Sequence, residues 1–174
     1  MISAGLSADL LVTPGMVSSV FGSPRPFNAG DVVLAVGRPL IALSNGATKV
    51  SFDKIIIGWK NTREARRAVA DSLPLLKKAK DVLAITISEG DADAERRSQA
   101  DLLAWLGAHG VTAHSELIEN QDGFIDVLES TARARQADLL VTGGYGHSRM
   151  REWLFGGMTR DLLEATDVTR FFSN

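Results

Sequence analysis

The stretch ADLLVTGGYGHSR, at residues 137–149, decides the fold because it joins an apolar strand to a glycine-rich turn. The same six residues ADLLVT also occur at residues 8–13, where PGMVSSVFGS follows in place of the glycines. An apolar run of this length is typical of a strand that is buried on both faces. The chain therefore contains the same strand twice, and only the second copy leads into a turn suited to a phosphate group.

Strands and helices alternate from residue 51 onward, and the pattern predicts an α/β fold. Connections that hold helices of 10–15 residues imply right-handed crossovers and a parallel sheet covered on both faces. Five such strands make a doubly wound open sheet, in which ligands bind beyond the carboxyl ends of the strands, where the strand order reverses. The expected strands occupy residues 54–59, 81–87, 111–118, 137–143 and 168–173.

The first 49 residues resemble the end of the same pattern. After ADLLVT, residues 29–36 are expected to form a helix and residues 37–44 a strand, in the order seen near the C-terminus. We therefore expect a partial, degenerate repeat (helix and two strands) at residues 1–49 and a complete domain at residues 50–174. The alternative is an N-terminal arm whose similarity is accidental. An unpaired apolar strand invites pairing, either with another chain or with the complete domain.

Composition and charge exclude several classes of protein. The chain has 174 residues, a formal net charge of −2 and no cysteine. A nucleic-acid-binding domain usually has a basic face, which this balance does not suggest. Disulfides, thiolate metal sites and cysteine nucleophiles are excluded. No apolar run approaches the ~18 residues that span a membrane, and the N-terminus lacks the features of a signal peptide. We expect a cytoplasmic protein with neither nucleic-acid nor membrane partners.

The glycines after the strand at residues 137–143 are suited to binding an anion. Glycines permit close approach of the backbone, and successive N–H groups in such a turn form an anion-binding nest. A second pair, Gly156 and Gly157, opens a helix whose free N–H groups also favour negative charge. The two elements together suggest a di- or triphosphate between them, with further contacts from His147 and Arg149. The alternative is a glycine-rich turn that only lets strand and helix pack.

The spacing of Gly143, Gly146 and Gly156 gives the pattern G-x2-G-x9-G, which resembles the ATP-binding motif of the universal stress protein family. Residues 52–79 resemble the first strand and helix of that family, and residues 136–163 resemble its fourth strand and nucleotide loop. The resemblance covers residues 51–174. With the N-terminal repeat, the chain resembles tandem members of the family that have lost most of the first domain.

The resemblance implies a Rossmann-like fold of the adenine nucleotide hydrolase-like type, with five parallel strands in the order 3-2-1-4-5. It also implies an adenine nucleotide as ligand, ATP with or without Mg²⁺, and a homodimer formed through the fifth strands. The nucleotide-binding residues that it implies are Gly58, Trp59, Lys60, Gly143, Gly146, His147, Ser148, Arg149, Gly156, Gly157, Met158 and Thr159.

Two positions depart from the pattern of the family. ATP-binding members usually have a small hydroxyl residue after the last glycine of the motif, where this chain has Gly157 and its nearest hydroxyl is Thr159. They usually have an aspartate after the first strand, where this chain has Lys60, which could pair with a phosphate instead. Trp59 could stack on a base, although a tryptophan at this place is more often part of the core.

No catalytic set of nucleophile, base and acid is visible, and the three histidines lack the spacing of metal ligands. Together with this absence, the resemblance implies an ATP-binding, regulatory stress-response module with no catalytic residues and no metal site in the protein. It would not be a fast enzyme, and slow ATP hydrolysis would rest on positioning alone. Two alternatives stay open: a protein of the same fold that binds no nucleotide and acts through dimerisation and protein partners, or a nucleotide-using hydrolase or transferase.

Overall fold

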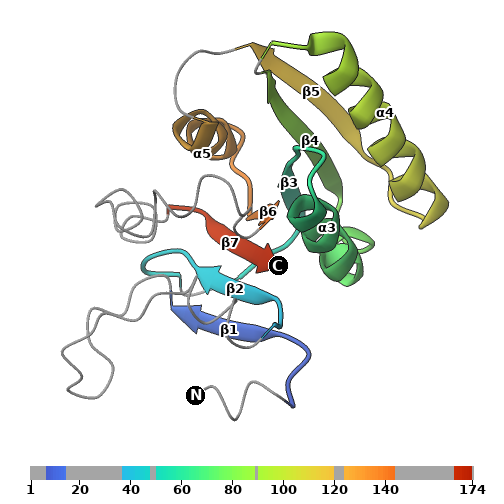
Figure 1. Cartoon of the computed structure of the whole chain (residues 1–174). Coiled ribbons are helices and arrows are strands. Elements are labelled where there is room, and N and C mark those ends of the chain that lie inside the picture. The colour runs from blue at the N-terminus through green and yellow to red at the C-terminus, as the bar shows by residue number, and fades with distance from the viewer. Residues whose placement is uncertain are drawn as a thin grey trace.

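The computed structural model describes residues 7–14, 37–47, 50–88, 90–119, 124–143 and 167–173. Within them a seven-stranded sheet has the order β1-β2-β7-β6-β3-β4-β5 (Figure 1). The strands are β1 (Leu11–Pro14), β2 (Leu40–Leu43), β3 (Lys54–Gly58), β4 (Asp81–Ser88), β5 (His114–Glu119), β6 (Leu139–Gly143) and β7 (Thr169–Ser173). The helices are α3 (Arg63–Leu76), α4 (Ala92–Ala108) and α5 (Phe124–Ala134).

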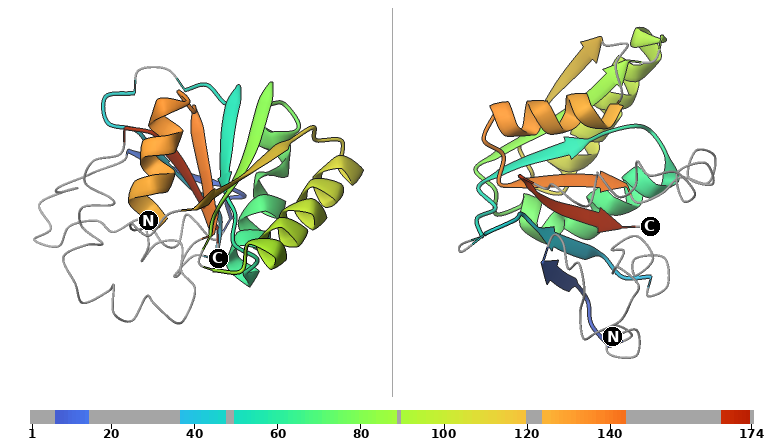
Figure 2. Two further views of the ribbon diagram at one scale, coloured as in Figure 1. Left: turned by 90° about the horizontal axis from the view of Figure 1, so that it is seen from above. Right: turned by 90° about the vertical axis from the view of Figure 1, so that its left-hand side faces the viewer.

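The sheet is covered on both faces at β3, β4 and β6, as the alternation of strands and helices predicts. Helices α3 and α4 lie on one face and α5 lies on the other (Figure 2). Ile55, Ile57 and Val141 belong to the apolar cluster under α3 and α4. Ile56 and Leu140 belong to the cluster under α5. Strands β3 and β6 therefore bury side chains on both faces, which explains their continuous apolar sequences.

The sheet differs from the expected one in size and direction. It has seven strands rather than five, because β1 and β2 extend it beyond β7. Strand β2 runs antiparallel to β7, and the other strand pairs are parallel. The observed architecture is thus an α/β fold with a mostly parallel sheet, in which β7, β6, β3, β4 and β5 are consecutive neighbours.

The two copies of ADLLVT occupy matching places in two strand pairs. In the first pair Leu11 lies opposite Leu40. In the second pair Leu140, the same position of the repeat, lies opposite Arg170. The antiparallel contact places Ile41 opposite Phe171. Leu40 precedes Ile41, and Arg170 precedes Phe171. The two strand pairs are therefore related by a two-fold axis that is perpendicular to the sheet and passes between Ile41 and Phe171.

Strand β7 is paired along both edges. Strand β6 lies on one side of it and β2 lies on the other. A backbone N–H of Ser44, just beyond β2, also donates to Oγ1 of Thr169 at 3.2 Å. The homodimer through the fifth strand requires the edge that β2 of the same chain occupies here. Dimerisation through β7 stays a prediction, and it would require β2 to leave.

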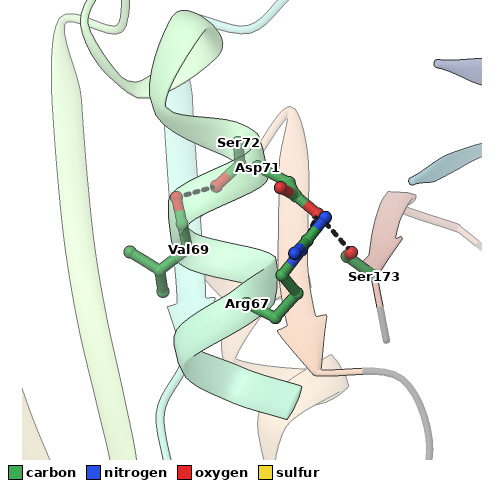
Figure 3. A network of polar contacts seen from close by, with 5 residues as sticks. All are labelled: Arg67, Val69, Asp71, Ser72 and Ser173. Carbon is green, nitrogen blue, oxygen red and sulfur yellow. Dashed lines mark hydrogen bonds and ion pairs between the residues drawn. The ribbon is translucent and has the colours of Figure 1, made fainter. Parts of the chain in front are cut away.

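Helix α3 is joined to the end of β7 by polar contacts. Asp71 accepts a hydrogen bond from Oγ of Ser173 at 2.5 Å and pairs with Nε of Arg67 at 2.8 Å (Figure 3). At the next residue, Oγ of Ser72 donates to the carbonyl of Val69 at 3.0 Å, which satisfies a fully buried hydroxyl. The contact between Asp71 and Ser173 thereby fixes α3 against β7, the strand that pairs with β2.

A buried ion pair joins β7 to α5 on the opposite face. The guanidinium of Arg170 pairs with the carboxylate of Glu129, and their side chains are 6% and 22% exposed. Burial lowers the pKa of Arg170 from its ordinary value to about 10, because the charged form loses solvation. A nearby carboxylate offsets part of that loss, so the two side chains depend on each other.

Helix α4 offers a stability test that is independent of any site. A Cβ added at Gly107 would meet nothing within 4 Å. We expect Gly107→Ala to raise the free energy of unfolding by about 0.5 kcal/mol, because alanine loses less backbone entropy in a helix. Urea denaturation measures this change. Gly110→Ala is the matched variant with the opposite sign, since Gly110 ends the helix at a φ of +80°. A stabilising Gly110→Ala would contradict the argument.

Candidate functional site

The carboxyl ends of β3 and β6 meet at the middle of the sheet. The two strands are parallel neighbours, and Gly58 lies opposite Thr142. From β3 the chain continues through α3 to β4 on one side, and it returns through α5 to β6 on the other side. The strand order therefore reverses between β3 and β6, which is where open α/β sheets bind ligands. This point brings the predicted residues Gly58, Lys60 and Gly143 to one edge.

Gly143 makes the closest approach at this edge. A Cβ built on it would lie 2.6 Å from the backbone nitrogen of Ala65 and 2.7 Å from the backbone carbon of Glu64. The first turn of α3 therefore packs directly against the end of β6, which only glycine permits. Thr62 caps this helix, because its Oγ1 accepts a hydrogen bond from the N–H of Ala65 at 3.2 Å. The positive end of the α3 dipole thus lies beside Gly143, the first glycine of the predicted motif.

Gly58 is needed for packing on the opposite face. A Cβ there would lie 2.6 Å from Cδ2 of Leu128 on α5 and 3.2 Å from Cγ2 of Thr142. These are ends of side chains rather than backbone. Gly58 therefore permits close packing of α5 on the sheet. This is a structural role, and it places Gly58 beside the ligand edge without requiring a ligand contact.

The suggestion that Trp59 stacks on a base is corrected by the structure. Its side chain is only 5% exposed and belongs to the apolar cluster under α3 and α4. Its Nε1 donates to Oγ of Ser98 on α4 at 2.9 Å, and its backbone N–H donates to the carbonyl of Ile85 at 2.8 Å. Both donors are satisfied inside the protein, so the indole joins β3 to α4 and the backbone N–H joins it to β4.

Lys60 and Glu64 place opposite charges near the same edge. Lys60 is exposed directly beyond Trp59, where a phosphate could approach it. Glu64 lies in the first turn of α3 and is only 9% exposed. A carboxylate there stabilises the helix dipole, and it also opposes a bound anion. Glu64 is not among the residues predicted from the sequence, although an acidic residue two positions after the cap Thr62 was the available signal.

The other predicted site residues lie outside the described part of the chain. They are Gly146, His147, Ser148, Arg149, Gly156, Gly157, Met158 and Thr159. The expected helix at residues 29–36 lies outside it as well. Among the residues that the structure does describe, no group of three or more histidine, aspartate or glutamate side chains could hold a metal ion. None of the helices described is both long enough and apolar enough to cross a membrane.

A separate cavity of about 220 Å³ lies at the amino ends of β3, β4 and β5. It is at the opposite end of the sheet from Gly143, so it is not the predicted nucleotide site. One of its cations, Arg135, is already paired with Glu116 at 2.5 Å. The lining residues are Lys54, Ile55, Ile56, Asp81, Leu83, His114, Arg135 and Ala137.

The fold has several counterparts among solved structures. No protein-family model and no curated protein matches the sequence. A universal stress protein from Archaeoglobus fulgidus DSM 4304 matches with a TM-score of 0.71 and 15% identity, over 99% of this chain and 65% of that one. This chain thus spans about two thirds of the length of that structure.

Two further structures cover the larger part of this chain. A universal stress protein in complex with cAMP matches over 69% of this chain and 95% of its own, with a TM-score of 0.53 and 16% identity. A hypothetical protein with a structure-based assignment of biochemical function matches over 71% and 96%, with a TM-score of 0.52 and 14% identity. The resemblance noted in the sequence is confirmed at the level of architecture: this chain has the fold of the universal stress proteins.

Proposed function

We propose that this protein binds an adenine nucleotide beyond the carboxyl ends of β3 and β6 and acts as a regulatory module. The observation that carries the proposal is the close contact of Gly143 with the first turn of α3, at the point where the strand order reverses. That contact leaves a backbone edge without a side chain beside a helix N-terminus, which suits a phosphate group. The spacing G-x2-G-x9-G and the neighbour that binds cAMP support the same ligand class.

The residues at the edge fit a phosphate better than a base. Lys60 supplies a positive charge, and Gly143 permits close approach of the backbone. We infer that Lys60 pairs with the phosphates in place of the aspartate expected there, and that the loop after Gly143 completes the site. Mg²⁺ would then be held by the phosphates with water, since Mg²⁺ usually retains several waters when it binds a nucleotide. We further infer slow turnover or none, because no residue is proposed as a catalytic base.

The proposal is tested by equilibrium binding of ATP, ADP, AMP and cAMP, measured by calorimetry with and without Mg²⁺. We expect micromolar binding of at least one of them. Gly146→Val should abolish it, because a β-branched residue cannot adopt the backbone conformations that glycine allows in a phosphate-binding turn. Glu64→Gln should tighten binding several-fold, because it removes a negative charge from the first turn of α3. Gly107→Ala is the control and should leave affinity unchanged.

Three results would refute the proposal. No binding at millimolar nucleotide would favour the alternative in which the protein acts through protein partners. Phosphate release well above background, lost in Gly146→Val, would favour a hydrolase. Unchanged affinity in both Gly146→Val and Glu64→Gln would place the nucleotide elsewhere on the molecule.

The N-terminal segment is proposed to be a partial repeat of the domain at residues 50–174. The supporting observation is that Leu11 and Leu140, at the same position of ADLLVT, have the same register toward their neighbouring strands. An accidental similarity would not be expected to reproduce that register.

A further inference from the structure

The outer edge of β1 has no part in the proposed nucleotide site. Strand β1 stands at one end of the sheet, and β2 is its neighbour on the inner side (Figure 1). The N–H of Leu11 donates to the carbonyl of Pro39 at 2.9 Å. Backbone groups point alternately to the two sides of a strand, so Leu11 and Thr13 face β2. The N–H and C=O groups of Leu10 and Val12 therefore point outward.

The second copy of the same sequence, in β6, shows that the corresponding edge can pair with another strand. In β6 the equivalents of Leu10 and Val12 are Leu139 and Val141, and both are 0% exposed. Strand β3 pairs with β6 on that side. In β1, by contrast, Leu10 is 37% exposed and Val12 is 61% exposed. Among the described residues no strand pairs with this backbone edge in β1, and its Leu10 and Val12 side chains also lack the cover that Leu139 and Val141 have in the apolar cluster under α3 and α4.

The edge of β1 has little of the protection that natural edge strands usually show. Lysines, bulges and inward-pointing charges commonly prevent pairing with another chain. Residues 10–14 carry no charge. Within residues 10–14 Pro14 is the protective feature, because it lacks an N–H and belongs to the outward-facing set. It shortens the edge at one end and leaves Leu10 and Val12 able to pair.

We propose that a second copy of this chain pairs with β1, antiparallel, around a two-fold axis at Val12. That axis places Val12 opposite Val12 of the second copy, so one uncharged stretch is complementary to itself. The chain already makes a contact of this kind, since β2 and β7 meet antiparallel with Ile41 opposite its counterpart Phe171. The paired β1 edges would extend the sheet across two protomers. So short an interface gives a weak dimer that depends on concentration.

The test uses a cysteine, because the chain has none of its own. Residues directly opposite each other in an antiparallel hydrogen-bonded pair have Cα atoms about 5.5 Å apart, within the range of a disulfide. We expect Val12→Cys to form a covalent dimer on mild oxidation, in a yield that rises with protein concentration. Val50→Cys is the control, since Val50 is 40% exposed and lies outside the strands. It should stay largely monomeric.

A second pair of measurements locates the interface. Val12→Pro removes only an outward N–H, so sedimentation should show a dimer for the wild type and a monomer for this variant. Phe171→Cys reports on a dimer formed through β7. Cross-linking of Phe171→Cys without cross-linking of Val12→Cys would overturn the proposal. A wild type that stays monomeric up to roughly 1 mM, a concentration that detects even weak association, would overturn it too.

Discussion

Glu129→Ala is expected to lower the free energy of unfolding by about 3 kcal/mol, because it leaves the buried guanidinium of Arg170 without its carboxylate. Arg170 is buried on β7, between β6 and β2, and it reaches α5 through Glu129. A domain of this size has a total stability of roughly 5–15 kcal/mol, so the loss is a large share of it. Urea denaturation followed by circular dichroism measures it.

A double variant keeps this prediction testable if Glu129→Ala does not fold. Replacing both partners, with Glu129→Leu and Arg170→Met, removes the buried charge together with its partner. Such replacements of buried pairs are often neutral or stabilising. Lys80→Ala is the matched control, because the pair of Lys80 with Asp53 at 2.8 Å is exposed and contributes little. A double variant as unstable as Glu129→Ala would show that packing, and not charge, explains the loss.

Gly143→Ala is expected to cost about 2–3 kcal/mol of stability and to weaken nucleotide binding in the same protein. The added Cβ would meet the backbone of Ala65 and Glu64 at 2.6 and 2.7 Å, and a helix backbone cannot move aside as a side chain can. The first turn of α3 must shift, which is an overpacking cost of 1–3 kcal/mol, and it moves away from the proposed phosphate position. Urea denaturation and calorimetry measure the two effects.

Gly58→Ala separates this cost from the general effect of adding a methyl group. Its Cβ would meet Cδ2 of Leu128 at 2.6 Å, which is the end of a side chain that can change its rotamer. We expect a cost below about 1 kcal/mol, since flexible side chains relieve overpacking. Equal costs at Gly58 and Gly143 would contradict the assignment of a special role to the contact with α3.

The strands were predictable because each one is a short apolar run between turn-forming residues. The run at residues 54–59 became β3 at Lys54–Gly58, and the run at residues 168–173 became β7 at Thr169–Ser173. The strand expected at residues 111–118 begins later, as β5 at His114–Glu119. Strand β5 is short of apolar residues, so its register depends on β4 rather than on its own pattern.

The arrangement of the N-terminal strands was not predictable in the same way. An apolar run at residues 37–44 indicates a strand, but it does not indicate which other strand this one pairs with. Its place beside β7 depends on a contact across the chain, Ile41 with Phe171, which no local pattern encodes. The candidate site shows the same limit. Glycine spacing indicated the edge at Gly143, and the burial of Trp59 against Ser98 followed only from the packing of α4.

The pairing of β2 with β7 also sets an order in which the protein is assembled during translation. Leu40 leaves the ribosome long before its partner Phe172. Until β7 has been synthesised, β2 has no β7 to pair with, and the apolar residues of β2 lack that partner on the incomplete chain. Contacts between residues so far apart in sequence form slowly, and unpaired edges are exposed to aggregation in the meantime. Efficient synthesis should therefore depend on how quickly the last strand is released.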